Sequence, residues 1–158
     1  MSETRLFDTK LTSQDVKEWT FQLMNRENFL PDCYRDYRSL IKIIGEKFSF
    51  EPRAVAIVQP DGHLGGMYFM GDIFPGHEGM LYMWVWGGWT PSMARQADTY
   101  VRFMADNYSL ARVTAKTPCD KLGRILSKEL SFTEEGRFKK GFMGDGKFKT
   151  LRQYRRLF

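Results

Sequence analysis

The stretch that decides the fold is AVAIVQPDGHLGGMYFMGDIFPGHEGMLYMWVW, residues 54–86. It holds three runs rich in β-branched and aromatic side chains, and the turn sequences at 59–62 and 75–76 separate them. Runs of this kind bounded by Gly, Pro and Asp are typical of strands joined by tight turns. The stretch therefore predicts an antiparallel meander of three strands, at residues 54–58, 63–74 and 79–86.

Two amphipathic helices are expected before the meander. Thr12 or Ser13 is placed to cap the first helix, which ends near Phe29. Pro31 opens the second, whose apolar residues follow helical spacing as far as Phe48. The chain thus begins with two helices that pack together.

The region after the meander alternates between helix and strand. Thr90 caps and Pro91 opens a helix, and residues 111–115 form a short strand. Another helix starts at Thr117 and Pro118. The inward faces of the two helices are expected to carry Ala94, Ala97, Val101, Met104 and Tyr108 on the first, and Leu122, Ile125, Leu126 and Leu130 on the second.

Two closing strands are expected at the end of the chain. Turn signals occur at 135–136 and 145–146, and the last strand is predicted at residues 147–157. A strand that follows a helix after an earlier strand usually pairs with that strand in parallel, through a right-handed crossover. The pattern therefore predicts a mixed sheet.

Composition favours a single domain over residues 1–158. The apolar fraction of 42% supplies enough surface for one core, and no linker-like tract interrupts it. The longest apolar stretch, residues 80–89, is about half of the roughly 20 residues that a membrane-spanning helix needs. The charged first ten residues do not resemble a secretory signal, so we expect a cytoplasmic protein.

Cysteine and histidine usage gives no sign of a disulfide framework or a metal site. Cys33 and Cys119 lie far apart, and we expect both to be reduced. With only His63 and His77 besides, no zinc-type spacing is present, so no metal is expected.

Most of the positive charge lies at the C-terminal end. The chain has a formal net charge of +5, and its last 22 residues hold a dense set of basic side chains. Such a set is either a solvated strand face or a surface that attracts the phosphates of nucleic acid or of a nucleotide cofactor. Its members are Arg137, Lys139, Lys140, Lys147, Lys149, Arg152, Arg155 and Arg156.

The order of the expected elements resembles the fold of the GNAT N-acetyltransferases over nearly the whole chain. A more specific likeness lies in the last third, which is similar to that family's run of Asn, small residue, Leu-Gly-Phe, Glu-Gly, Asp-Gly and a late Tyr. The resemblance implies an α/β (α+β) fold with a mixed central sheet, an antiparallel N-terminal meander, a splayed parallel strand pair and about four helices. The residues that carry it are Asp120, Gly123, Leu126, Leu130, Ser131, Phe132, Glu135, Gly136, Asp145, Gly146 and Tyr154.

The resemblance implies that acetyl-CoA lies between two splayed parallel strands, here residues 79–86 and 111–115, and that an amine attacks its thioester. It places the pyrophosphate on backbone amides at the N-terminus of the helix that begins near Pro91. The cofactor-binding residues implied in this way are Met83, Trp84, Val85, Thr90, Ser92, Met93, Ala94, Arg95 and Asp120.

The cofactor loop departs from the family pattern, which reads Arg or Gln, Gly, any residue, Gly, any residue, then Gly or Ala. The sequence here is Thr-Pro-Ser-Met-Ala-Arg, residues 90–95. Pro91 has no amide donor, and Met93 stands where a glycine is expected. The hydroxyls of Thr90 and Ser92, or the side chain of Arg95, are the groups that would compensate.

Candidate acid and base residues are sparse. Ser127 occupies the position of the family's acidic tyrosine and is a much poorer acid. Glu78 and Asp72 are the carboxylates near the splayed strands, although each also fits a solvated turn residue, and His77 fits either a base or an exposed hydrogen-bonding residue. A site without a strong acid can still work by holding its reactants together.

The aromatic run Tyr82, Trp84, Trp86 and Trp89 has two interpretations. It would line a substrate groove, or it would belong to a strand buried on both faces. Trp89 lies beyond the strand and is the one we expect to be most exposed.

Three functions are consistent with these patterns. The first is an acyl-CoA-dependent N-acyltransferase with acetyl-CoA as cofactor and an amine as acceptor. The second is a non-catalytic protein like the small GNAT-like proteins of tailed bacteriophages, a head-assembly or internal virion component with a viral protein partner, found in the host cytoplasm or the virion. The third is a nucleic-acid-binding module, in which Phe148, Tyr154 and Phe158 stack on bases between basic residues.

Overall fold

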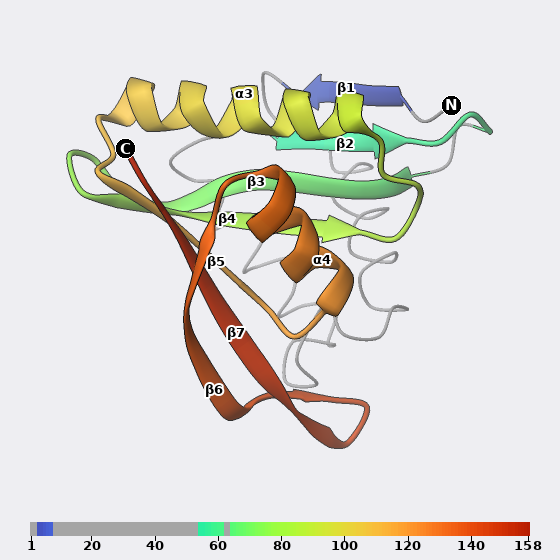
Figure 1. Ribbon diagram of the computed structural model, residues 1–158. Coiled ribbons are helices and arrows are strands. Elements are labelled where there is room, and N and C mark those ends of the chain that lie inside the picture. Colours follow the sequence, from blue (N-terminus) through green and yellow to red (C-terminus); the bar gives the residue numbers. More distant parts are fainter. Residues whose placement is uncertain (1–2, 8–53, 62–63) are drawn as a thin grey trace, which may run out of the picture.

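The computed structural model describes residues 3–7, 54–61 and 64–158, and the two helices predicted between Thr12 and Phe48 lie outside the described residues. The described strands form one seven-stranded mixed sheet in the order β1-β2-β3-β4-β5-β7-β6 (Figure 1). The predicted mixed sheet is therefore confirmed.

The predicted meander is present as three antiparallel strands. They are β2 (Ala54–Val58), β3 (Leu64–Phe74) and β4 (Glu78–Val85). The pairing of β3 with β4 shifts register between Gly71 and Phe74, and Asp72 in this bulge has a φ of 47°. A bulge of this kind bends the strand and redirects a side chain, here that of Asp72.

A strand that the sequence analysis did not predict precedes the meander. β1 (Glu3–Phe7) pairs antiparallel with β2 and forms an edge of the sheet. The strand has only five residues, and some of them are charged; both features are usual for an edge strand.

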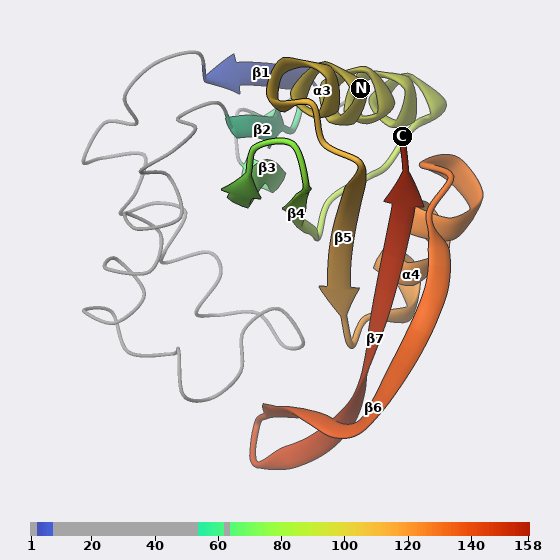
Figure 2. The same cartoon turned by 90° about the vertical axis from the view of Figure 1, so that its left-hand side faces the viewer.

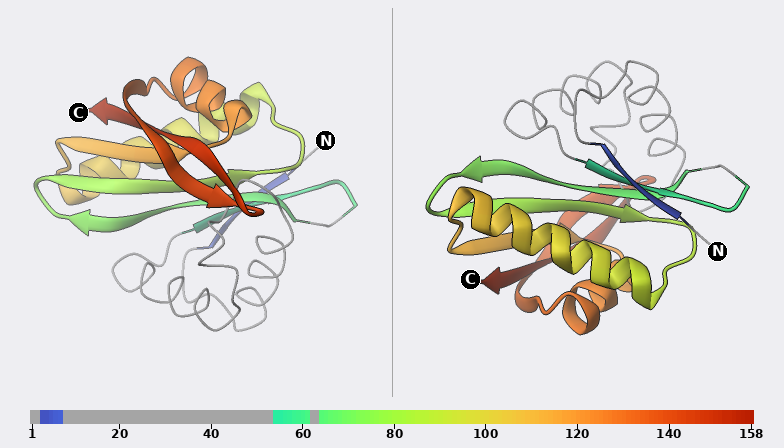
Figure 3. Two further views of the ribbon diagram at one scale, coloured as in Figure 1. Left: turned by 90° about the horizontal axis from the view of Figure 1, so that it is seen from below. Right: turned by 90° about the horizontal axis from the view of Figure 1, so that it is seen from above.

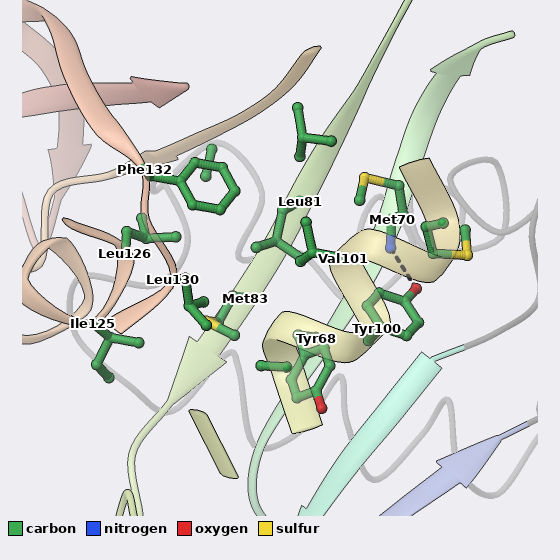
Figure 4. Packing of buried hydrophobic residues seen from close by; sticks show 14 of the residues in the cluster. Tyr68, Met70, Leu81, Met83, Tyr100, Val101, Ile125, Leu126, Leu130 and Phe132 are labelled. Carbon is green, nitrogen blue, oxygen red and sulfur yellow. Dashed lines mark hydrogen bonds between the residues drawn. The ribbon is translucent and has the colours of Figure 1, made fainter. Parts of the chain in front are cut away.

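The helix after the meander is α3 (Pro91–Tyr108). The Thr90 side chain caps it by accepting a hydrogen bond from the Met93 amide at 3.2 Å, and Ser109 ends it in the left-handed conformation. Four of the five predicted inward residues are buried, and Tyr108 is partly buried against the core. Figure 4 shows the Tyr100 hydroxyl accepting a hydrogen bond from the Met70 amide, at 2.8 Å, which fastens the helix to β3.

The second helical segment has two parts. It follows β5 (Arg112–Thr117) and consists of α4 (Asp120–Arg124) and the π-helical η2 (Ile125–Glu129), in which the Leu130 amide bonds to the Ile125 carbonyl five residues back. Its four predicted apolar residues are all buried. α3 and α4 cover the same face of the sheet (Figure 3). Neither helix has the length and apolar content to span a bilayer.

The chain closes with β6 (Thr133–Gly144) and β7 (Lys147–Leu157), and the bounds predicted for the last strand are confirmed. β7 inserts between β5 and β6 and is antiparallel to both. Figure 2 shows the two strands as a long hairpin that continues past the end of β5.

Candidate active site

β4 and β5 pair in parallel at one end only. Their register runs from Glu78 opposite Arg112 to Met80 opposite Thr114. β4 then continues to Val85 and β5 to Thr117 without further pairing between them. The two strands therefore splay, as the resemblance implied, and alternate backbone groups of residues 81–85 face a strand edge without a β5 partner.

Apolar side chains pack beside the splayed part of β4. Leu81, Met83 and Val85 alternate toward the face covered by the helices, and all three are buried. Figure 4 shows Leu130 next to Met83 and Phe132 near Leu81, with Leu126 and Ile125 in the same buried cluster. Side-chain packing thus takes over where backbone pairing stops.

Two hydrogen bonds cross from the β4–α3 loop to the second helical segment. The Lys121 ammonium donates to the Gly87 carbonyl at 2.9 Å, and the Trp89 indole Nε1 donates to the Glu129 carboxylate at 2.8 Å. Trp89 is partly buried against the core. Tyr82, Trp84 and Trp86 have the same intermediate exposure, so the expectation that Trp89 is the most exposed residue of this run stays a prediction. The indole has an acceptor and an apolar surface within reach, which accounts for its burial.

The N-terminus of α3 has few amides left for a ligand. Pro91 has no N–H, and Thr90 accepts from the Met93 amide through its side chain and from the Ala94 amide through its carbonyl, at 3.1 Å. Ser92 is therefore the first-turn position whose amide the cap does not use. No acidic residue lies in the first turn of α3, so no carboxylate within the turn neutralises the positive end of the helix dipole.

The side chains of the cofactor loop divide into two groups. Those of Met93 and Ala94 belong to the core, with Met93 only 2% exposed. Ser92 and Arg95 are exposed beside them. Ser92 and Arg95 are consequently the side chains of this turn that a ligand in solvent can reach.

Asp120 opens α4 on the other side of the splay. Its carboxylate forms an ion pair with Arg152 of β7. The residues implied for cofactor binding come from three elements. Met83, Trp84 and Val85 belong to β4, and Asp120 belongs to α4, which Lys121 ties to the loop. The others lie at the cap and start of α3: Thr90, Ser92, Met93, Ala94 and Arg95.

Ser127 uses its hydroxyl within its own helix. The hydroxyl donates to the Gly123 carbonyl at 2.8 Å, four residues back, on the exposed side of the segment. The buried phenol of Tyr154 packs against the same turn. Its hydroxyl lies so close to Gly123 that a Cβ atom added there would be only 2.5 Å from it. Burial raises the pKa of Tyr154, so the phenol stays neutral near pH 7.

Glu78 and His77 lie at the paired end of β4. Glu78 forms an ion pair with Arg112, with 3.2 Å between Nε and Oε2, and His77 is exposed. Together with Phe74 and Ala111 they line an open hollow of about 580 Å³. Leu81, the first residue of the splayed part, is three positions further along the strand than Glu78, which is about 10 Å.

Asp72 and Tyr82 form a pair that the sequence analysis named only as separate residues. The Tyr82 hydroxyl donates to the Asp72 carboxylate. The Tyr82 ring stacks on Phe69 with ring centroids 5.0 Å apart, and Trp84 lies next in the same row. The register of the β3–β4 hairpin brings this row together on the sheet face opposite to α3.

No family model matches the sequence, and no curated protein sequence matches it. Solved structures of similar architecture do. The spermidine N-acetyltransferase from Vibrio cholerae in complex with CoA and spermine superposes with a TM-score of 0.68 at 13% identity, covering 98% of this chain and 95% of that one. The chain has the fold of the GNAT acetyltransferases.

Two further structures with this fold are similar over nearly their whole length. The ribosomal-protein-S5-alanine acetyltransferase from Vibrio fischeri has a TM-score of 0.67 at 17% identity, with 99% of this chain and 92% of that one covered. RimL, a ribosomal L7/L12 α-N-protein acetyltransferase in complex with CoA, has a TM-score of 0.69 at 14% identity, with 99% and 93% covered. The predicted GNAT resemblance is thus confirmed at the level of the fold.

Proposed function

We propose that this chain is an acyl-CoA-dependent N-acyltransferase whose acyl-CoA lies along the splayed edge of β4. The observation that carries the proposal is the end of pairing between β4 and β5 at Met80 and Thr114. An unpaired strand edge offers amides and carbonyls to an extended ligand, and the arm of CoA contains two amide groups.

We place the pyrophosphate of CoA at the N-terminus of α3, beside this edge. The Ser92 amide, the Ser92 hydroxyl and the Arg95 guanidinium are the groups we assign to the pyrophosphate, with Thr90 holding the turn in place. Lys121, across the splay, adds a positive charge next to the loop. One free amide is fewer than a glycine-rich loop provides, so we expect binding to be weak, in the micromolar range or above.

The reaction needs a base and an acid close to the thioester. The amine nitrogen attacks the thioester carbonyl, the new N–C bond forms, the C–S bond breaks, and sulfur takes up the proton that nitrogen releases. We assign proton transfer to the pair of Asp72 and Tyr82, because Tyr82 is the second residue past the last paired position of β4. Glu78 and Ser127 stay weaker candidates, since the first is paired with Arg112 and the second with its own helix.

An amine acceptor is consistent with the relatives that share the fold. One is a spermidine N-acetyltransferase in complex with spermine, and another acetylates the α-nitrogen of a ribosomal protein. The partly exposed rings of Tyr82 and Trp84 and the carboxylate of Asp72 are groups that attract a cationic amine.

Isothermal titration of the protein with CoA and acetyl-CoA at low salt tests the binding step. Ser92→Asp adds a negative charge at the helix N-terminus, so it should stabilise α3 slightly and weaken CoA binding at least about tenfold. Ser92→Asn is the uncharged comparison: it also removes the hydroxyl but adds no charge, so it should weaken CoA binding clearly less than Ser92→Asp does. An absence of binding at millimolar CoA, or equal affinities for the two variants, would contradict the assignment.

Thiol release from acetyl-CoA in the presence of spermine or N-terminal peptides tests the chemical step. Asp72→Asn should lower turnover by about 100-fold without a matching change in CoA affinity. Asp106→Asn, on the exposed side of α3, is the matched control. Equal turnover in both variants would remove Asp72 from the reaction.

A further inference from the structure

The β6–β7 hairpin extends beyond the sheet that carries the proposed acyltransferase site. β5 pairs with residues 152–157 of β7, so the rest of β7 pairs with β6 alone. Figure 2 shows this part, residues 137–151, continuing past the end of β5; we name it the hairpin arm. It lies on elements other than β4 and α3.

The hairpin arm carries most of the net charge of the chain. Five of its side chains are basic and one, Asp145, is acidic, which gives a net +4 out of +5 for the protein. Glu134, just outside the arm, pairs with Arg137. The other basic residues of the arm are Lys139, Lys140, Lys147 and Lys149.

Large apolar side chains are exposed among these charges. Phe138 is 48% exposed, Phe148 56% and Met143 38%. The Lys140 ammonium lies 5.6 Å from the centre of the Phe148 ring. Lys140 reaches this position from a bulge between Phe138 and Phe142, with a φ of 55°, a conformation that residues with a side chain rarely adopt.

One face of the hairpin arm joins the exposed ring to a basic hollow. Phe148, Thr150 and Arg152 alternate along β7 and so share a face, and Arg137, opposite Arg152, shares it too. A hollow of about 350 Å³ opens at the base of this face, between the start of α4 and the hairpin. Its lining residues are Pro118, Asp120, Arg137, Lys149, Thr150 and Arg152.

We propose that the hairpin arm binds single-stranded nucleic acid. Its basic side chains would contact the phosphates, and the Phe148 ring would stack on a base. Basic grooves with exposed aromatic side chains bind single strands in this way, because every base offers a flat face. An acidic polypeptide would satisfy the charges but would leave the exposed rings without a stacking partner, which is why a nucleic acid is the better fit. The binding needs no acyl transfer.

Fluorescence anisotropy with labelled dT12 and rU12 tests the proposal. With about four phosphate contacts, affinity should fall on the order of 50-fold between 50 and 200 mM salt. Phe148→Ala should weaken binding about fivefold or more, whereas Phe103→Ala, an aromatic residue of similar exposure on α3, should leave it unchanged. Both side chains are exposed, so both variants should fold, which circular dichroism checks.

Charge variants give a second comparison. Replacing Lys139, Lys140, Lys147 and Lys149 by Gln should abolish measurable binding and flatten the salt dependence, while replacing Arg124 and Lys128 on the second helical segment should not. Three results would overturn the proposal: no binding of dT12 or rU12 at 50 mM salt, equal effects of Phe148→Ala and Phe103→Ala, or equally effective competition by polyglutamate. Tighter binding to a duplex of the same length would also overturn the single-strand assignment.

Discussion

The two ends of the β4–β5 pair are held together in different ways. At the paired end, residues 78–80 bond to β5 through the backbone, and Glu78 and Arg112 add an ion pair. At the splayed end, buried side chains of β4 meet those of the second helical segment, and Lys121 and Trp89 bridge the loop to it. The first end depends on main-chain bonds that any sequence can form, and the second depends on particular side chains.

This difference is the reason for placing the proposed CoA site at the splayed end. Backbone pairing at the first end leaves no strand edge, whereas the second end keeps an edge that side chains flank without pairing to it. The loop that follows this edge is the one that Lys121 and Trp89 connect to the second helical segment. The side chains that stabilise the splayed end therefore flank the edge at which we propose that CoA binds.

The largest expected effect is a loss of packing at the splayed end. Leu126 is 1% exposed and belongs to the same buried cluster as Leu81 and Met83. Leu126→Ala should lower the free energy of unfolding by about 3 kcal/mol, measured by urea denaturation, since it removes buried methyl groups and leaves a cavity. A change below about 1 kcal/mol would mean that the segment is not part of the core.

A middle-sized effect is expected where α3 joins the end of the second helical segment. Arg156 donates to Asp98 at 2.6 Å and to the Leu130 carbonyl at 2.9 Å. Burial alone would raise the pKa of Asp98, but hydrogen bonds from Arg102 and Arg156 and their charges bring it below its usual value. Asp98→Asn should lower the free energy of unfolding at pH 7 by about 1.5 kcal/mol.

The pH dependence of that difference follows from the lowered pKa. A carboxylate with a lowered folded-state pKa contributes stability above its unfolded pKa of about 3.9, and this contribution is lost as the pH falls through the folded value. The gap between the unmodified protein and Asp98→Asn should therefore be constant from pH 7 to about 5 and close below pH 4. A gap that persists at pH 2 would show that the ion pair is not its cause.

The smallest effect is expected at the paired end. The Glu78 and Arg112 side chains are both substantially exposed, and exposed ion pairs contribute little. Glu78→Gln should change the free energy of unfolding by less than about 0.5 kcal/mol in the same denaturation experiment. A loss comparable with that of Leu126→Ala would reverse the contrast between the two ends.

The sequence was sufficient where local patterns and tertiary packing agree. The bounds of β7 and the inward face of α3 were predicted because alternation, helical spacing and capping all favour the observed elements. β1 was missed because an edge strand owes its pairing to β2 and not to its own residues. The π-helical turn of η2 was missed because one extra residue hardly changes the apolar spacing.

The candidate site was less predictable because it depends on contacts between distant residues. The loop pattern places Met93 among the ligand-binding positions, yet its side chain is core, and only the fold reveals this. The burial of Trp89 depends on Glu129, forty residues away, and the pairing of Tyr82 with Asp72 depends on a bulge in β3. Such contacts leave no periodic signal in the sequence.

Hydrogen–deuterium exchange of the protein with and without saturating CoA tests the central claim most directly. The account predicts slower exchange in the splayed residues 81–85 of β4 and at the start of α3, with no change in the paired residues 78–80. Equal exchange with and without CoA in residues 81–85, or protection confined to the basic hairpin arm, would contradict it.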